Sequence, residues 1–175
     1  MSKKSFSWRE QLQVGDRGEE LLMQYYPSPL VVYPEHRADF RRLSDGKLIE
    51  LKTDTYGLDK TENLFIERWG NIEQRKPGGP FRARKDRVPV FIYYFIRHNV
   101  WLEFDSKELC KLVERLTKKS NLVYIKSHGW AVAGYKVPIR DVLSIAQVHT
   151  FETPSVSGLA DWRAFLARTE KEEEK

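Results

Sequence analysis

The chain has 175 residues, of which 41% are hydrophobic and 31% are charged, and its formal net charge is +5. This length suits one domain, and the hydrophobic content with five tryptophans indicates a packed core rather than a disordered chain. Cys110 is the only cysteine, which excludes an intrachain disulfide and a cysteine-rich metal site.

Neither a signal peptide nor a membrane span is indicated by the pattern of apolar residues. The first eight residues lack an apolar core, and the longest apolar run, Val88 to Ile96, contains Pro89 and is too short to cross a bilayer. We therefore expect a cytoplasmic protein with no membrane partner. We expect a single domain over residues 1–168, followed by a charged C-terminal tail over 169–175.

The first half of the chain predicts a helix followed by short strands. Apolar or small residues recur at helical spacing from Trp8 to Tyr26, and two prolines end the pattern. The Asp45-Gly46 pair is typical of a tight β-hairpin turn. The predicted strands of this half are Leu30–Tyr33, Asp39–Leu43, Lys47–Lys52 and Asn63–Glu67.

The second half begins with a segment rich in Gly, Pro and Arg, from Trp69 to Arg87, which predicts a loop. A hairpin across His98-Asn99 follows, and then a helix capped by Asp105 or Ser106. The buried stripe expected on that helix consists of Leu109, Leu112, Val113 and Leu116. The remaining predicted elements are the strands Leu122–Ile125 and Trp130–Val137, a short helix beginning at Pro138, and a helix over 158–170.

The segment that indicates chemistry is the predicted hairpin. Glu50 and Lys52 are two residues apart on one strand, so both face the same side of the sheet, while Ile49 and Leu51 face the other. Asp39 begins the partner strand near the level of Glu50. Two carboxylates so close repel each other unless a cation lies between them, and oxygen ligands of this kind favour Mg²⁺ or Mn²⁺. The alternative for Asp39, Glu50 and Lys52 is a purely structural salt bridge on the edge of a hairpin.

Such a site suits phosphodiester hydrolysis, with Lys52 holding the attacking water or neutralising charge on the phosphate. An acidic residue, a hairpin and then Glu-X-Lys resembles the signature of the PD-(D/E)XK nuclease superfamily. The resemblance covers roughly residues 15–67. It implies an α/β fold with a restriction-endonuclease-like core, in which helices flank a mixed central β-sheet. It also implies Mg²⁺, replaceable by Mn²⁺, bound by Glu19, Asp39, Glu50 and the main-chain carbonyl of Leu51.

Glu19 enters this set through the resemblance and through helical phase. The superfamily often carries an acidic residue on the helix before the sheet, and position 19 shares a stripe with Leu12, Gly15, Leu22 and Tyr26. Glu20 falls on the polar side. The alternative for Glu19 is a partly exposed carboxylate paired with an arginine.

Two further groups of residues are expected to contact DNA. The strand from Thr61 to Glu67 resembles one found in phage and bacterial members of the superfamily, which implicates Asn63 and Glu67 in supporting the site or in contacting the substrate. The predicted loop follows a flexible Gly78-Gly79 pair, and its cations are expected to bind phosphates: Arg82, Arg84, Lys85 and Arg87. Trp69 is left open between base stacking and core packing.

The sequence therefore predicts a Mg²⁺-dependent DNA endonuclease with Glu19, Asp39, Glu50 and Lys52 as catalytic residues. A basic domain without a separate recognition module favours a structure-selective enzyme, such as a homodimeric Holliday junction resolvase acting in recombination, repair or replication. If a phage encodes it, the location is the host cytoplasm. The alternatives are an inactive DNA-binding module, an exonuclease or restriction-type enzyme acting on linear DNA, and an RNA nuclease.

Overall fold

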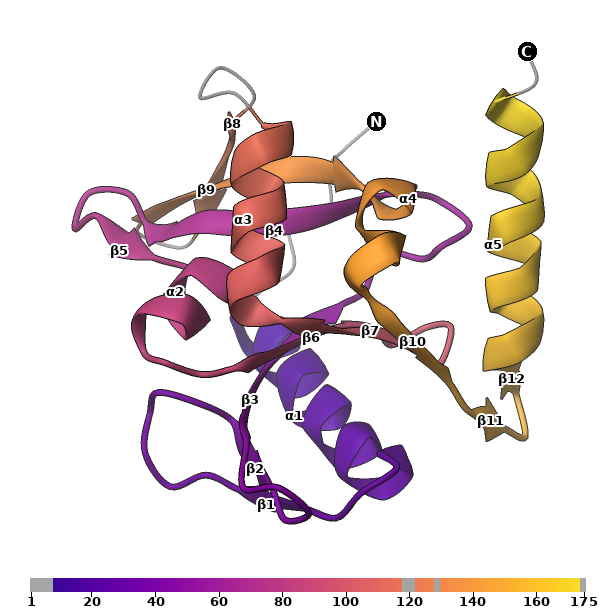
Figure 1. Ribbon diagram of the computed structural model, residues 1–175, viewed down its shortest axis with the longest axis horizontal. Helices are drawn as coiled ribbons and strands as arrows, with labels where there is room; N and C mark the ends of the chain where they lie inside the picture. Colours follow the sequence, from indigo (N-terminus) through magenta and orange to yellow (C-terminus); the bar gives the residue numbers. More distant parts are fainter. Residues whose placement is uncertain (1–7, 118–121, 128–129, 174–175) are drawn as a thin grey trace.

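The computed structural model describes residues 8–117, 122–127 and 130–173, and these form a mixed α/β fold with two main β-sheets (Figure 1). The helical elements are α1 (Trp8–Tyr25), α2 (Gly79–Lys85), α3 (Ser106–Leu116), α4 (Ile139–Val142), the 3-10 turn η2 (Leu143–Ile145) and α5 (Gly158–Glu173). None of these helices is long and apolar enough to cross a lipid bilayer.

The larger sheet has six strands in the order β1-β2-β3-β6-β7-β10. Only β3 and β6 are parallel, and every other neighbouring pair is antiparallel, so the sheet is mixed. Its strands are β1 (Leu30–Val32), β2 (Phe40–Arg42), β3 (Leu48–Asp54), β6 (Val90–Phe95), β7 (Val100–Asp105) and β10 (Gln147–Thr150).

A second, antiparallel sheet has the order β5-β4-β9-β8 and lies beside the first. Its strands are β4 (Asn63–Asn71), β5 (Lys76–Pro77), β8 (Leu122–Ser127) and β9 (Trp130–Pro138). Strands β11 (Glu152–Thr153) and β12 (Val156–Ser157) form a small hairpin that leads into α5. The connection from β3 to its parallel neighbour β6 therefore contains β4, β5 and α2.

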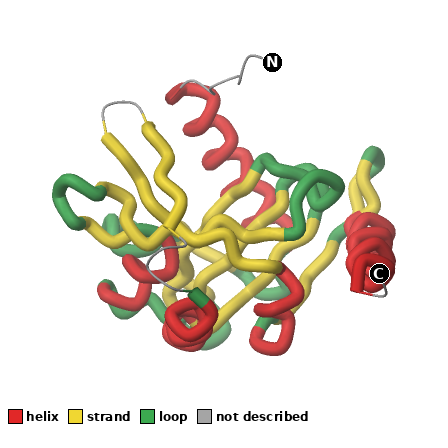
Figure 2. Tube along the Cα trace, turned by 90° about the horizontal axis from the view of Figure 1, so that it is seen from above, coloured by secondary structure: helices red, strands yellow, loops and turns green. Residues whose placement is uncertain are grey.

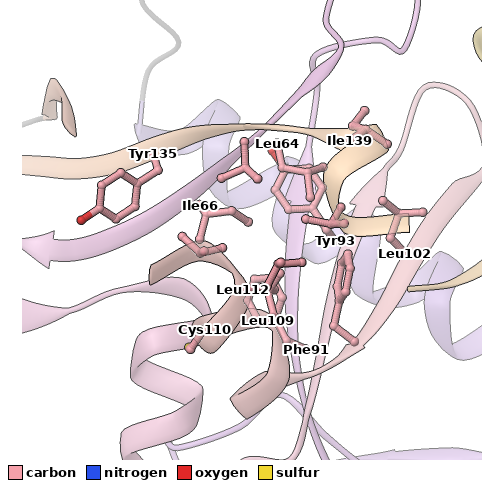
Figure 3. Close-up of a cluster of buried hydrophobic side chains, with 14 of the residues drawn as sticks. Leu64, Ile66, Phe91, Tyr93, Leu102, Leu109, Cys110, Leu112, Tyr135 and Ile139 are labelled. Atoms are coloured by element: carbon pink, nitrogen blue, oxygen red, sulfur yellow. The ribbon is translucent and has the colours of Figure 1, made fainter. Parts of the chain in front are cut away.

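The two faces of the six-stranded sheet contribute to two separate cores. Along β6, Phe91, Tyr93 and Phe95 belong to one core, and the alternate residues Val90, Ile92 and Tyr94 belong to the other. The first core includes residues of α3 and of the second sheet, and Figure 3 shows Leu64 and Ile66 of β4 meeting Leu109 and Leu112 of α3 there. The second core contains Leu21 and Leu22 of α1. Helices α1 and α3 accordingly lie on opposite sides of the sheet (Figure 2).

The predicted hairpin is confirmed. Phe40 of β2 pairs with Ile49 of β3, and Gly46 in the turn has φ +72°, the left-handed region that glycine adopts without strain. The cap of α3 is also confirmed, because the Asp105 carboxylate accepts hydrogen bonds of 2.9 Å from the amides of Lys107 and Glu108.

The predicted loop from Trp69 to Arg87 is wrong. Strand β4 continues to Asn71, β5 pairs with it, and residues 79–85 form α2, which buries Phe81 and Ala83. The Gly78-Gly79 pair is not a flexible joint: a Cβ atom on Gly78 would lie 2.7 Å from the Gly70 nitrogen. Pro80 in the first turn and cations in the last turn are typical of a helix, so the sequence contained two indications of α2.

Smaller predictions also need correction. Leu12 and Leu116 are 46% and 42% exposed, so neither belongs to a buried stripe. The side chain of Trp8 lies outside the described part. Pro138 ends β9 and precedes α4 instead of being its first residue. Helix α5 continues through Glu173, past its expected end, and residues 174–175 lie outside the described part.

Helix α5 stands at the side of the molecule (Figure 1). Apolar and polar side-chain contacts attach it to the rest of the fold. Trp162 and Phe165 are buried in the first core. His98, in the turn between β6 and β7, lies 2.7 Å through Nδ1 from the Asp161 carboxylate. Arg168 donates to the Leu58 carbonyl. The helix therefore packs against the loop that follows β3.

Gly18 is the point where α1 contacts β3 most closely. A Cβ atom at Gly18 would lie 2.9 Å from Thr53 Cγ2 and closer still to its hydroxyl, whereas one at Gly15 would have no atom within 4 Å. We expect Gly18→Ala to lower the free energy of unfolding by about 1–3 kcal/mol through overpacking. Gly15→Ala should leave it unchanged or raise it by up to about 1 kcal/mol. Urea denaturation measures both, and equal effects would contradict the close approach.

Candidate active site

Glu50 and Lys52 lie on the same face of β3, as predicted. Parallel pairing sets Glu50 beside Phe91 and Lys52 beside Tyr93, and both aromatic residues belong to the core that contains α3. Ile49 and Leu51 pack instead with the core that contains α1. The acidic and basic side chains of β3 therefore point towards α2 and the second sheet.

Asp39 is bonded to β3 on both sides of Glu50. Its amide donates to the Ile49 carbonyl at 3.0 Å, and its carboxylate accepts a hydrogen bond of 2.7 Å from the Leu51 amide. Burial raises the pKa of Asp39, opposed by the Leu51 amide and by the positive charge of Arg82. The two main-chain anchors hold the Asp39 carboxylate next to that of Glu50, as the sequence predicted.

Helix α1 places Glu19 near these acids. Glu19 is partly buried, and its pKa is raised first by burial and then by the negative charges of Asp39 and Asp16. Glu20 is exposed and pairs with Arg17 at 2.9 Å on the helix surface. The predicted phase of the helix at these two positions is confirmed, and Glu19 is electrostatically coupled to Asp39.

Arg82 reaches Glu50, which the sequence did not predict. Its Nη2 donates to Glu50 Oε1, while Glu50 Oε2 is buried without a hydrogen-bond partner among the described residues. Burial and the nearby Asp39 raise the pKa of Glu50 to about 7, although Arg82 acts in the opposite direction. Arg82 was expected in a loop as a contact for DNA phosphates, and it is instead the counter-ion of Glu50.

Lys52 is held by Glu67 of β4. Its Nζ lies 2.8 Å from Glu67 Oε1. Burial lowers the pKa of Lys52, but the negative charges of Glu67, Asp54 and Glu50 outweigh burial and raise it overall, so the ammonium stays charged. Asn63 lies four residues earlier, at the start of β4, where its amide donates to Thr61 Oγ1 at 3.1 Å. The structure brings Glu67 to the site and does not bring Asn63.

The other cations of the predicted loop are divided between two environments. Both outer nitrogens of Arg84 donate to Glu114 of α3, at 3.1 and 2.9 Å. Lys85 and Arg87 are exposed, and neither has an ion-pair partner within the described ranges. Trp69 is partly buried, with the Arg68 guanidinium 5.3 Å from its ring centroid.

Tyr93 connects the two sheets beside the site. Its hydroxyl accepts a hydrogen bond of 3.2 Å from the Phe65 amide of β4 and donates one to the Asp54 carboxylate of β3. Asp54 also accepts from the Tyr56 amide at 2.7 Å, the turn role that its position suggests. The sequence does not predict this bridge, because Tyr93 is one residue of an apolar run that is typical of a buried strand.

No protein-family model matches the chain. A comparison with curated proteins also finds no match.

The carboxylates are the kind of ligand that a hard cation prefers, but their side chains are too far apart to bind one as they stand. Within the described residues, no three His, Cys, Asp or Glu side chains are close enough to hold a metal ion. Glu19, Asp39 and Glu50 nevertheless offer oxygen donors that Mg²⁺ prefers, and the pKa of each is raised. Glu50 Oε2 has no hydrogen-bond partner among the described residues and is a free oxygen donor. The donor chemistry therefore fits Mg²⁺, and Arg82 lies where positive charge is needed.

The raised pKa of Glu50 predicts a stability change with pH. Below pH 4.5 the carboxyl is protonated in both states, and between pH 4.5 and 7 only the folded state keeps the proton. Wild-type stability should therefore fall across this window because of Glu50, by up to about 3 kcal/mol. Glu50→Gln removes this loss, so the variant should be more stable than wild type at pH 8 and similar at pH 4.

The measurement is urea denaturation of wild type, Glu50→Gln and Glu20→Gln at several pH values. Glu20→Gln is the matched control because Glu20 is exposed, and its difference from wild type should not vary in this way. A constant difference between Glu50→Gln and wild type from pH 4 to 8 would contradict the assignment.

Proposed function

We propose that the protein is a Mg²⁺-dependent deoxyribonuclease that hydrolyses phosphodiester bonds. The observation that carries this proposal is the position of the Asp39 carboxylate, just before β2, next to Glu50 of β3, with the charged Lys52 two residues further along β3. Burying two like charges together is costly, and a bound cation offsets that cost. A salt bridge on a surface hairpin would need neither the burial of Glu50 nor the adjacent Asp39.

Glu19, Asp39, Glu50 and the Leu51 carbonyl would hold Mg²⁺, with Mn²⁺ as a substitute. When bound, the ion supplies positive charge to a phosphoryl oxygen and lowers the pKa of a coordinated water. Lys52 would orient the attacking water or neutralise charge developing on the phosphate. Glu67 is a positioning residue, since its 2.8 Å contact fixes the direction of the Lys52 side chain.

The architecture supports this reading. Helix α1 packs on β3, the strands β1, β2 and β3 form an antiparallel meander, and β6 adds in parallel next to β3. We propose that these elements are a restriction-endonuclease-like core. The second sheet and α2 would then be additions that supply Glu67 and Arg82.

For the substrate we propose branched DNA, such as a Holliday junction, in recombination, repair or replication. The exposed Lys85 ends α2, the exposed Arg87 lies just beyond it, and both are available for phosphates. A junction needs two symmetric cuts, so a homodimer is part of the proposal. Nucleases that act on linear DNA or on RNA use the same chemistry, so the cleavage panel below includes both kinds of substrate.

A second candidate is a nucleic-acid-binding module without catalysis. The Arg82–Glu50 ion pair favours it, because an arginine that stays on Glu50 would neutralise the carboxylate permanently. Such a module would keep the exposed cations and would not need Lys52 to be directed by Glu67.

A cleavage panel distinguishes these functions. Wild type, Asp39→Asn and Lys52→Met are incubated with a four-way junction, a flap, linear duplex, single-stranded DNA and a structured RNA, with Mg²⁺ or with a chelator. We expect wild type to cut the junction only with Mg²⁺, and each variant to lose about a hundredfold or more in rate. Both variants should still bind DNA in the chelator. Binding without cleavage by wild type would favour the inactive module.

A second prediction uses the phase of α1. Glu19→Gln should reduce the cleavage rate by roughly tenfold or more, since it removes a carboxylate coupled to Asp39. Glu20→Gln should cleave at the wild-type rate because Glu20 is exposed and pairs with Arg17 on the surface. Single-turnover rates at saturating Mg²⁺ decide the matter. Equal rates for the two variants would contradict a catalytic role for Glu19.

A further inference from the structure

The contact between Arg82 and Glu50 is a single one, unlike the forked arginine pairs of the described residues. Two nitrogens of Arg84 donate hydrogen bonds to the two carboxylate oxygens of Glu114. Arg42 forms the same kind of pair with Asp45. Such forked pairs satisfy both carboxylate oxygens. Arg82 bonds only Oε1 of Glu50 and leaves Oε2 buried and unpartnered. Glu50 is therefore only half satisfied by its counter-ion.

The positive charge of Arg82 also acts on Asp39, although no hydrogen bond joins the two. One guanidinium therefore faces two adjacent carboxylates. When both carboxylates are ionised, two negative charges face one positive charge. The site could therefore bind a cation in addition to Arg82, or a small cation in place of the Arg82 guanidinium.

The Arg82 head group can leave without disturbing α2. The backbone of the helix is held by its neighbours Phe81 and Ala83, which are 2% and 0% exposed. The Arg82 side chain is 40% exposed, whereas that of Glu50 is 9% exposed. Rotation about the side-chain bonds of Arg82 thus takes the guanidinium into solvent, while Glu50 stays in place.

We infer that Arg82 is an exchangeable counter-ion: it neutralises Glu50 in the free protein, leaves when a divalent cation binds, and then contacts a DNA phosphate. The inference rests on the proposed function and adds a way in which metal and DNA binding are linked. A guanidinium suits both partners, because carboxylates and phosphates accept the same forked hydrogen bonds. Arg82 then belongs to the substrate-binding machinery only when the metal is present.

The first test is calorimetric titration of DNA-free protein with Ca²⁺ and with Mn²⁺ at pH 8.5. Arg82→Met keeps the apolar stem and removes the competing charge, so we expect roughly tenfold tighter cation binding than wild type, the order of one lost charge-assisted hydrogen bond. Arg82→Lys keeps a competing charge and should bind cations nearly as wild type does. Arg84→Met, two residues away on the same helix and paired with Glu114, is the matched control and should not differ.

The second test is the affinity for a four-way junction with Ca²⁺ or with a chelator, after a gel has shown that the DNA stays intact. Arg82→Met should bind like wild type in the chelator and several-fold more weakly with Ca²⁺. In Arg84→Met, any change should be the same in both conditions. This difference between conditions separates an exchanging residue from a permanent phosphate contact or a structural one.

The outcomes separate the exchange from the proposed function. Unchanged or weaker cation binding by Arg82→Met, with wild type binding metal and cutting DNA, overturns the exchange alone. Equal loss of DNA affinity with and without Ca²⁺ also overturns it, because Arg82 would then contact DNA in both states. If wild type binds no divalent cation and cuts no DNA, both proposals are wrong.

Discussion

The parallel pairing of β3 with β6 decides where the charged side chains of the site lie. Every residue of β6 is buried, and its residues alternate between two cores. Because β3 runs beside it in register, Glu50, Lys52 and Asp54 all face the side occupied by α2 and the second sheet. A shift of one residue would exchange the two faces, placing these charges against α1 and Leu51 against β4.

The charges on that side are arranged in pairs that cross element boundaries. Lys52 is matched with Glu67 of β4, Asp54 with the hydroxyl of Tyr93, and Glu50 with Arg82 of α2. The third pair leaves one oxygen of Glu50 without a hydrogen-bond partner, and Arg82 only partly compensates the charge of Asp39. The uncompensated part of the network coincides with the residues that would bind a metal ion.

The sequence was sufficient for the parts of the site that depend on local periodicity. The hairpin carrying Asp39, Glu50 and Lys52 follows from alternation and an Asp-Gly turn, and the inward phase of Glu19 follows from helical spacing. It was not sufficient for Arg82 or Tyr93, whose roles depend on contacts between segments remote in the chain. Helix α2 was missed because seven residues rich in arginine show too little apolar pattern, and its stability comes from packing on α3 and β4.

The connection between β3 and β6 has a consequence for the order of folding. The proposed metal ligands Glu19, Asp39 and Glu50 all lie before residue 51, whereas Arg82, in α2, and strand β6 are synthesised after β4 and β5. A nascent chain thus exposes Asp39 and Glu50 ahead of their counter-ion and of the strand that buries them. Contacts of such long sequence separation form late and slow the search for the native state. An N-terminal fragment that ends before Tyr93 therefore lacks part of this charge network.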